Sequence, residues 1–425
     1  MPTHFSLRPG CVIHPFHGVG TDECIVETPD ARKFKLSGTA HRLIEQLNEG
    51  TSIEDLCAQF PDMTGEDLRK FVLTNYGDLL VDSSGNSFAS QPPRPQTAAK
   101  SGLLAAWTIL PGAMTSAVSS RLSLLLAPST AVVSFVCILI GHIFIYFHHG
   151  LAPARLVGAH VSVILALCAL SVLVHELGHA SALSRYGGTP SGIGFGLFIL
   201  LPVFYADVSQ AWKLRRWQRI VVDIGGIYFQ QLFFALTALL AVLWNSASMR
   251  AVCIAIDVMT LVALNPAFRF DGYWLVADWL GLTHLHRSAA LYLRGMLRSV
   301  AGSRSAQGVY PPNLSRTKTF VFICYALLSS VFLTALIALN VRWVYSAVLA
   351  LIKGLPQLGH ALLKAVGEGN WISSADLAVA CGFLLASGIT VIVGAGWQAR
   401  TAVLFLRRRH VATRDTASHA FGGQQ

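Results

Sequence analysis

Long apolar runs constrain the fold of this chain more than any other feature. They cover residues 129–147, 161–182, 220–244, 250–270, 318–341 and 374–396. A helix needs about 20 consecutive apolar residues to cross the hydrocarbon core of a bilayer. Only 13% of the 425 residues are charged, whereas a soluble domain carries about 25%. The sequence therefore predicts a mainly α-helical, polytopic membrane bundle with about six transmembrane helices.

A further apolar stretch, residues 343–370, is interrupted by Lys353, Gly354 and Pro356. Charged and helix-breaking residues within such a run are typical of a segment that lies on the membrane or enters it without crossing. The sequence therefore predicts an interfacial or re-entrant element here.

The basic residues predict an orientation. Lys and Arg gather in the connections 184–219 and 282–318 and in "LRRRH" near the C-terminus, and cytoplasmic loops carry such an excess. No signal peptide precedes the first run. We therefore expect a multi-pass protein of the bacterial inner membrane with a cytoplasmic N-terminus. The net charge of +10 belongs to these loops, and no nucleic-acid-binding motif is present, so we expect no nucleic-acid partner.

Residues 1–90 have the pattern of a small soluble α+β domain. Three strand-like runs, "CVIHPF", "ECIVET" and "KFKLS", come first. Three helices are predicted after them, and Ala40, Leu43, Ile44 and Leu47 share one face of the first. Ser52 and Thr64 precede acidic residues, as N-caps do. Residues 91–102 are a predicted linker, 103–410 the membrane domain and 411–425 a flexible tail.

"HELGH", residues 175–179, places three ionisable side chains inside an otherwise apolar run. Four residues apart on a helix, His175 and His179 face the same side and can hold one zinc ion. Glu176 then lies beside the ion and can activate water. The alternative is a helix end whose polar residues merely reach the interface. A carboxylate at membrane depth is costly without a partner or a wet cavity, which favours the zinc site.

A catalytic zinc needs a third protein ligand. "NPAFRFDGYW", residues 265–274, breaks helical hydrogen bonding at Asn265-Pro266 and has a turn signal at Asp271-Gly272. A carboxylate beside irregular backbone at membrane depth indicates a protein-lined cavity, so Asp271 is the predicted ligand. Asp257 and Asp223 remain rivals, and His284 and His286 are weaker candidates.

These motifs resemble the site-2-protease clan of intramembrane zinc metallopeptidases. "LLPVFYADVSQAWKLRRWQR", "GGIYFQ" and "NPAFRFDGYW" are similar to its bacterial branch of peptide zinc metallopeptidases, over roughly residues 100–410. The resemblance implies that His175, His179 and Asp271 bind zinc and that Glu176 is the catalytic base.

The chain departs from that clan at one motif. Where many members have Gly-x-x-x-Asn, Gly226 is followed at this spacing by Gln230. Gln230 and Asn265 are candidate substrate-binding residues, while hydrogen bonding between helices is the alternative for Gln230. The segment 191–210 is predicted to form a hairpin or re-entrant element near the site. An extended edge there could bind substrate as an added strand.

Residues 9–85 resemble the PqqD-like domain, which recognises ribosomally made, modified peptides. The pieces that carry the resemblance are "ECIVETPDARKFKLSGTAHRLIEQLNEGTSIEDL" and "DLRKFVLTNYGDLLV". It implies that the leader of a peptide substrate adds a strand to the small sheet. The alternative is a generic winged-helix-like domain with a regulatory or DNA partner.

Together these patterns predict an intramembrane zinc endopeptidase that processes a peptide or membrane-associated precursor. Maturation or export of a ribosomally made, modified peptide is the expected setting, and a peptide exporter is a candidate partner. The alternative is a peptide-binding chaperone or export partner that holds zinc without turnover. An intact HELGH favours the enzyme, because a pure binder has no use for Glu176.

Overall fold

The computed structural model describes residues 5–15, 24–29, 33–59, 64–82, 105–149, 159–198, 201–282, 284–300, 314–371, 373–382, 384–385, 388 and 396. The predicted linker 91–102 and tail 411–425 lie outside these residues. So does much of the second half of the predicted apolar run 374–396.

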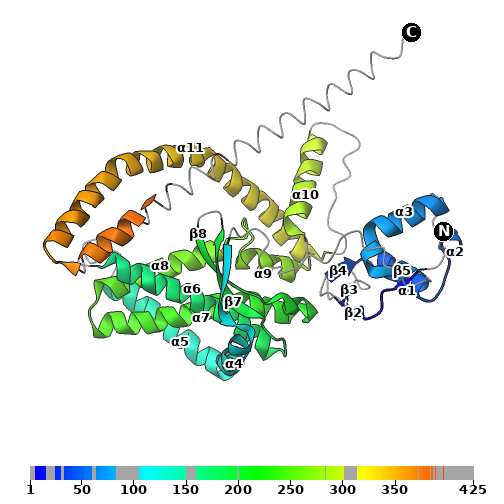
Figure 1. Cartoon of the computed structure of the whole chain (residues 1–425), viewed down its shortest axis with the longest axis horizontal. Helices are drawn as coiled ribbons and strands as arrows, with labels where there is room; N and C mark the ends of the chain where they lie inside the picture. The colour runs from blue at the N-terminus through cyan, green and yellow to red at the C-terminus, as the bar shows by residue number, and fades with distance from the viewer. Residues whose placement is uncertain are drawn as a thin grey trace, which may run out of the picture.

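The N-terminal residues form a small α+β unit at one end of the molecule (Figure 1). All three predicted strands are present, in an antiparallel sheet of order β2-β3-β4, and the three predicted helices follow. A second pair, β1 with β5, joins the two ends of the unit and was not predicted. The elements are β1 (Phe5–Leu7), β2 (Val12–Pro15), β3 (Cys24–Glu27), β4 (Lys33–Leu36), α1 (Gly38–Asn48), α2 (Ile53–Cys57), α3 (Gly65–Tyr76) and β5 (Leu80–Asp82).

Local sequence explains these helices. Ser52 accepts a hydrogen bond from the backbone N–H of Asp55, and Thr64 accepts one from Asp67, so both predicted N-caps are confirmed. The predicted apolar face of α1 is buried, and Leu47 packs there with Leu56 of α2. The unit thus has its own core.

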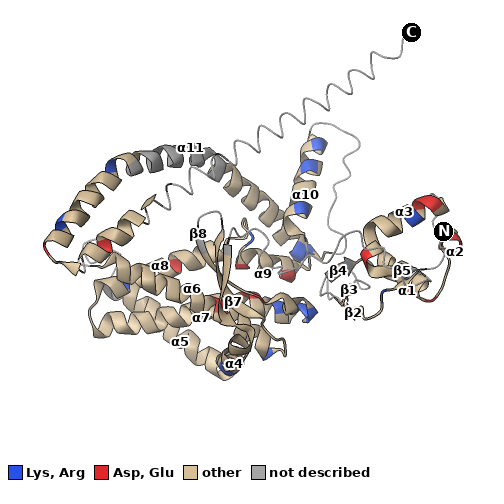
Figure 2. Cartoon of the chain, viewed as in Figure 1, with Lys and Arg blue, Asp and Glu red and all other residues tan. Residues whose placement is uncertain are grey.

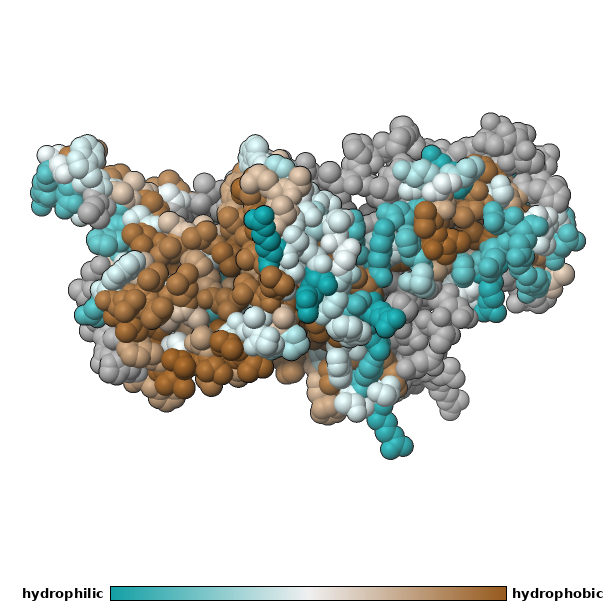
Figure 3. Space-filling model, turned by 90° about the horizontal axis from the view of Figure 1, so that it is seen from below, coloured by the Kyte–Doolittle hydropathy of each residue, from teal (hydrophilic) through white to brown (hydrophobic). Residues whose placement is uncertain are grey.

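Five helical segments in the described part of the chain are long and apolar enough to cross a membrane. Charged residues are sparse along them (Figure 2), and the bundle presents a broad apolar surface (Figure 3). Exposed apolar residues on α5 and α7 include Val132, Phe135, Leu236 and Leu239. The segments are Pro128–Phe147, Val161–Arg185, Arg216–Leu243, Ala247–Leu264 and Arg316–Ala335. They belong to α5 (Pro128–Ile143), α6 (Val161–Arg185), α7 (Arg216–Leu243), α8 (Ala247–Leu264) and α11 (Arg316–Gly367).

Helices α6 and α7 meet at two glycines. A Cβ on Gly178 of α6 would overlap the carbonyl oxygen of Gly225 on α7, and a Cβ on Gly225 would lie 2.8 Å from the carbonyl oxygen of Gly178. The two backbones can approach this closely only because neither residue has a side chain. This contact fixes the spacing of the two helices that carry the polar site.

Before and after α6 the chain builds a three-stranded antiparallel sheet of order β6-β7-β8. Strands β7 (Gly192–Phe198) and β8 (Leu201–Ala206) form the hairpin predicted for residues 191–210. Strand β6 (Ala105–Pro111) pairs with β7 along its other edge, although α4 (Gly112–Leu122), α5 and α6 separate the two strands in the sequence. Strand β8 is an edge strand, and it lies beside α6.

The last described helices are α9 (Asp271–Leu280), α10 (Leu285–Val300) and α11. Helix α10 occupies part of the predicted connection 282–318. Helix α11 continues through Gly354 and Pro356 and arches over the bundle (Figure 1). The residues that interrupt the apolar run therefore do not interrupt the helix, and the interfacial or re-entrant placement of residues 343–370 stays a prediction. Strong helix formers such as Leu and Ala flank the proline, and membrane proteins tolerate proline within helices.

Two polar contacts tie distant segments to the bundle. Arg219, which the sequence placed among the basic loop residues, lies in α7 and is 5% exposed. It forms an ion pair with Asp278 of α9, with Nη2 2.8 Å from Oδ1. Asp376 caps α6 by accepting a hydrogen bond from the Ser162 N–H at 2.9 Å.

The N-terminal unit touches the connection that precedes α7. Nζ of Lys213 lies 2.9 Å from Oε2 of Glu27 on β3. The ring of His14 on β2 meets the ring of Trp212 edge to face at 5.0 Å. The unit and residues 212–213 therefore lie on the same side of the bundle.

Candidate metal centre

The two histidines of HELGH lie on one face of α6, as predicted. Both are buried, each 8% exposed, and their Nε2 atoms are 3.1 Å apart. Helical geometry brings residues four apart to the same face. The close pair is thus a direct result of the spacing of His175 and His179 in the sequence.

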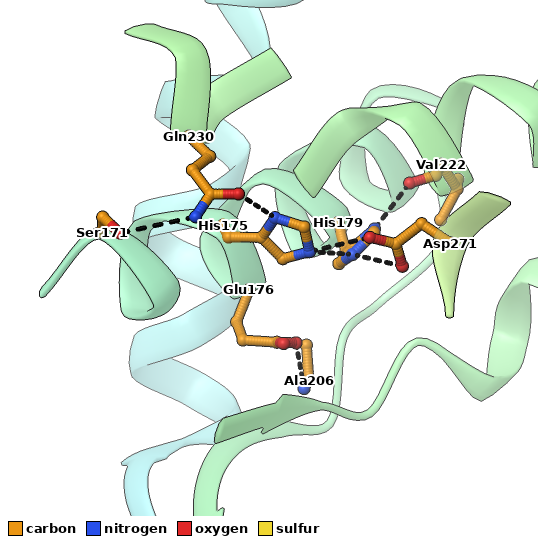
Figure 4. A network of polar contacts seen from close by, with 8 residues as sticks. All are labelled: Ser171, His175, Glu176, His179, Ala206, Val222, Gln230 and Asp271. Atoms are coloured by element: carbon orange, nitrogen blue, oxygen red, sulfur yellow. Dashed lines mark hydrogen bonds and ion pairs between the residues drawn. The ribbon is translucent and has the colours of Figure 1, made fainter. Parts of the chain in front are cut away.

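Asp271, the first residue of α9, completes the group. Its Oδ2 lies 3.0 Å from Nε2 of His175, and its Oδ1 lies 3.4 Å from Nε2 of His179 (Figure 4). Among the residues that the structure describes, these three side chains form the group with metal-ligand geometry, with ligand atoms within 4.8 Å of one another. The sequence left Asp257 and Asp223 open as rivals, and both lie outside this group.

Hydrogen bonds set the tautomer of each histidine. Nδ1 of His179 donates to the carbonyl oxygen of Val222 at 2.7 Å. Nδ1 of His175 donates to Oε1 of Gln230 at 3.2 Å, and Nε2 of Gln230 donates to Oγ of Ser171 at 3.4 Å. Because Nδ1 carries the proton in each neutral ring, each Nε2 presents a lone pair.

Two imidazole lone pairs and a carboxylate therefore converge on one point, an arrangement that a cation stabilises. In a tetrahedral zinc site with bonds of about 2.0–2.1 Å, neighbouring ligand atoms lie about 3.3 Å apart. The three measured separations of 3.0, 3.1 and 3.4 Å are close to this value. The donor set of two imidazoles and one carboxylate also matches catalytic zinc sites. These residues fit a zinc ion.

The absence of a side chain at Gly226 leaves space for the two histidine rings. A Cβ at this position of α7 would lie 2.6 Å from Nε2 of His175 and closer still to Nε2 of His179. Any other residue would therefore occupy the space where the ligand nitrogens converge. The sequence singled out Gly226 only for its spacing from Gln230.

Glu176 points to another side of the same space. Its Oε2 accepts a hydrogen bond from the backbone N–H of Ala206, the last residue of β8, at 2.6 Å (Figure 4). Glu176 is outside the three-ligand group, so it is free to act as a base. The role of the Ala206 N–H was not predicted, because a backbone group carries no signal in the sequence.

A cavity of about 420 Å³ opens beside these groups. Most of its wall is apolar, and the polar side chains are those of the centre together with Gln230 and Arg269. The lining residues are Val172, His175, Glu176, Gln230, Val258, Met259, Val262, Ala263, Arg269, Phe270, Asp271 and Trp274. Such a cavity suits a mainly apolar ligand held by a few polar contacts.

A curated protein is similar to part of this chain. It is the "Putative peptide zinc metalloprotease protein YydH" of Bacillus subtilis (strain 168), 27% identical over 120 residues. The match covers 28% of this chain and 48% of that protein, so the chain spans about half of the relative's length. No family model and no solved structure matches the chain. The similarity supports a relationship to zinc metallopeptidases.

The two candidate substrate-binding residues have different surroundings. Gln230 lines the cavity, is 2% exposed and is hydrogen-bonded to His175. Its geometry supports the orientation of a ligand histidine as well as the predicted contact with substrate. Oδ1 of Asn265 accepts from the Ala267 N–H at 3.0 Å, which is a turn contact at the end of α8, and Asn265 does not line the cavity.

The rival carboxylate Asp257 belongs to a separate polar network. It accepts from the hydroxyl of Tyr146 at 2.5 Å and from Nε2 of Gln231 at 3.1 Å, and it lies 3.2 Å from Nε2 of His142. This network joins α5, η4 (Phe144–His149), α7 and α8. Its geometry is that of a contact between bundle helices.

His286 contacts Ala267 and Tyr273 instead of the three-ligand group. Burial lowers the pKa of His286, and the charge of Arg269 lowers it further, although a hydrogen bond to the carbonyl oxygen of Ala267 acts in the opposite direction. The ring packs against Tyr273. His284 and His286 both lie outside the ligand group.

Proposed function

We propose that this chain is a membrane-embedded zinc endopeptidase of the site-2-protease type. The observation that carries the proposal is the convergence of His175, His179 and Asp271 beside the carboxylate of Glu176. These side chains come from two segments far apart in the sequence. A binding protein needs the ligands but has no need of Glu176.

The chemistry divides between the metal and the chain. A zinc ion in such a site polarises a carbonyl and lowers the pKa of a water molecule. Glu176 takes the proton from the attacking water and passes it to the leaving amine. The Ala206 N–H holds the Glu176 carboxylate in place. Gln230 and the Val222 carbonyl keep both histidines in the tautomer that presents Nε2.

The proposed substrate is a peptide or a membrane-associated precursor. Strand β8 supports an extended substrate, because it is the edge of its sheet and ends at the residue that contacts Glu176. The apolar cavity supports a mainly apolar stretch at the scissile bond. We assign the process to the maturation or export of a ribosomally made, modified peptide.

The N-terminal unit is the proposed recognition element for the leader of that peptide, as a PqqD-like domain. The three-stranded sheet supports this role, since its edge strands β2 and β4 offer backbone groups for an added strand. The ion pair between Glu27 and Lys213 places the unit on the same side of the bundle as a basic connection. That side is cytoplasmic in the proposed orientation, with the bundle in the inner membrane.

Glu176→Gln tests the proposal. The variant should keep its fold and its zinc, because glutamine replaces the base and no ligand, while cleavage is lost. His175→Ala and Asp271→Ala should lose both zinc and cleavage. A matched control is Glu368→Gln, at the residue that follows α11, whose side chain is 60% exposed; this variant should behave as the wild type.

Substrates would be found by mass spectrometry of peptides that accumulate in cells carrying Glu176→Gln. Cleavage of those peptides by the purified full-length wild type, and by no variant of the centre, is the expected result. A Glu176→Gln protein that cleaves them as fast as the wild type would refute the proposed mechanism.

A further inference from the structure

Arg269 is the basic side chain in the wall of the cavity. It shares this wall with His175, Glu176 and Asp271. It belongs to the irregular segment between α8 and α9, and its side chain is exposed. Seven of the twelve lining residues are apolar, namely Val172, Val258, Met259, Val262, Ala263, Phe270 and Trp274.

Arg269 has no carboxylate partner among the residues that the structure describes. Asp271, two residues later, has both carboxylate oxygens directed at the two histidines. Glu176 is held by the Ala206 N–H. The buried Arg219, by contrast, is paired with Asp278. Charged side chains that face a cavity of a membrane bundle usually serve a function.

The charges of the cavity wall indicate the charge of the ligand group that would pair with Arg269. With zinc bound, the two positive charges of the ion are balanced by the carboxylates of Asp271 and Glu176, since both histidines are neutral. The guanidinium of Arg269 remains, because arginine stays protonated in proteins. Among the residues that line the cavity, one positive charge therefore remains uncompensated beside an apolar wall.

We propose that Arg269 binds a carboxylate of the substrate, so that the centre selects apolar peptides with one negative charge close to the scissile bond. This inference rests on the proposed peptidase function and deepens it. A guanidinium matches a carboxylate with two parallel N–H donors, a geometry that gives specificity as well as attraction. The cavity of about 420 Å³ has room for only a few residues, so the carboxylate belongs to the stretch that occupies it. It comes from a Glu or Asp side chain or from the C-terminus of a peptide.

Binding can be tested without cleavage by using the full-length, zinc-loaded Glu176→Gln protein in nanodiscs. Fluorescent peptides with one apolar core carry Glu, Gln or Lys at each of the positions next to the core. A second set ends at the core, with a free C-terminal carboxylate or with an amide. Affinity is measured by anisotropy, and zinc content and melting temperature are measured for every variant.

The expected result is that one Glu position, or the free C-terminus, binds about tenfold more tightly than its neutral counterpart, which is equivalent to about 1.4 kcal/mol. Added to the Glu176→Gln protein, Arg269→Lys should keep part of this preference for a carboxylate and Arg269→Gln should abolish it. Arg269→Glu should favour the Lys peptide. A matched control is Arg287→Gln, at an exposed arginine of α10 outside the cavity wall, which should leave the preference intact. The two peptide sets distinguish an internal carboxylate from a C-terminal one.

Equal affinity for Glu, Gln and Lys peptides, or binding of none of them, would overturn the inference. So would a preference for Glu that survives Arg269→Glu. Cleavage by the wild-type protein is scored separately. Selective binding without cleavage would contradict the peptidase function but still support carboxylate recognition. Cleavage without selective binding would support the peptidase function but contradict carboxylate recognition. A uniform fall in kcat for every peptide in Arg269→Gln, with unchanged ratios between peptides, would assign Arg269 to the reaction and overturn its role in selection.

Discussion

Replacing Gly226 by alanine would place a methyl carbon 2.6 Å from Nε2 of His175, whereas ordinary contact begins at 3.4 Å. At least one imidazole must therefore retreat by most of an ångström. Helices α6 and α7 cannot separate to make room without losing the contact between Gly178 and Gly225. Zinc–ligand distances tolerate only about 0.2 Å of change. We expect zinc affinity to fall at least about 100-fold, equivalent to about 2.7 kcal/mol.

The stability of the zinc-free protein should change little. Alanine is favoured over glycine in a helix by about 0.8–1 kcal/mol, and turning a histidine ring away costs about 0.5–1.5 kcal/mol. These effects nearly cancel. Gly226→Ala thus separates the metal centre from the fold, whereas Gly178→Ala, which overlaps backbone, should damage both.

The assay is zinc competition against a chelator with the full-length protein, together with melting curves with and without zinc. Zinc should raise the melting temperature of the wild type by linkage, and it should raise that of Gly226→Ala less. Gly359→Ala in α11 is the matched control, because no atom lies within 4 Å of the added carbon. Wild-type zinc affinity in Gly226→Ala would show that the metal does not bind between these histidines.

Three further outcomes follow from other parts of the fold. Asp257→Asn should lower the melting temperature while zinc content stays at one ion per chain, and loss of zinc would make Asp257 a ligand after all. Arg219→Ala leaves Asp278 without its partner and should destabilise the bundle by about 3 kcal/mol. This is near the lower end for buried ion pairs, because the Asp278 carboxylate is 22% exposed. A denaturant midpoint equal to that of the wild type would refute this prediction. A chain starting at residue 103 should cleave its peptide poorly at low substrate concentration, and its activity should recover as the substrate approaches the millimolar range, since a tether changes local concentration only. Full activity of the truncated chain at low substrate concentration would contradict the recognition role of the N-terminal unit.

Patterns that act within one helix were sufficient to predict much of this structure. The spacing of His175 and His179 and the N-caps Ser52 and Thr64 depend on neighbours within four residues, and all four were predicted correctly. Asp271 was predicted from a break in helical backbone rather than from spacing. Only the fold distinguishes it from its rivals, because α9 packs against α7 and brings Asp271 next to His175.

Long-range contacts were not visible in the sequence. The pairing of β6 with β7 joins residues separated by α4, α5 and α6, and no local pattern specifies it. Arg219 follows other basic residues in the sequence and could not be distinguished from a loop residue there, because its burial depends on the distant Asp278. Pro356 lacks the N–H of a helical hydrogen bond, and its local sequence did not reveal that α11 continues through it between good helix formers.

The cap on α6 has a consequence for the order in which the candidate metal centre is made. Helix α6 carries His175, His179 and Glu176, but its first turn is bonded to Asp376, 214 residues later than Ser162. The ligand Asp271 is also synthesised well after both histidines. A nascent chain therefore contains His175, Glu176 and His179 long before Asp271 and the cap exist. The group of His175, His179 and Asp271 can assemble only after the start of α9 has been made, and the first turn of α6 receives its cap from Asp376 later still.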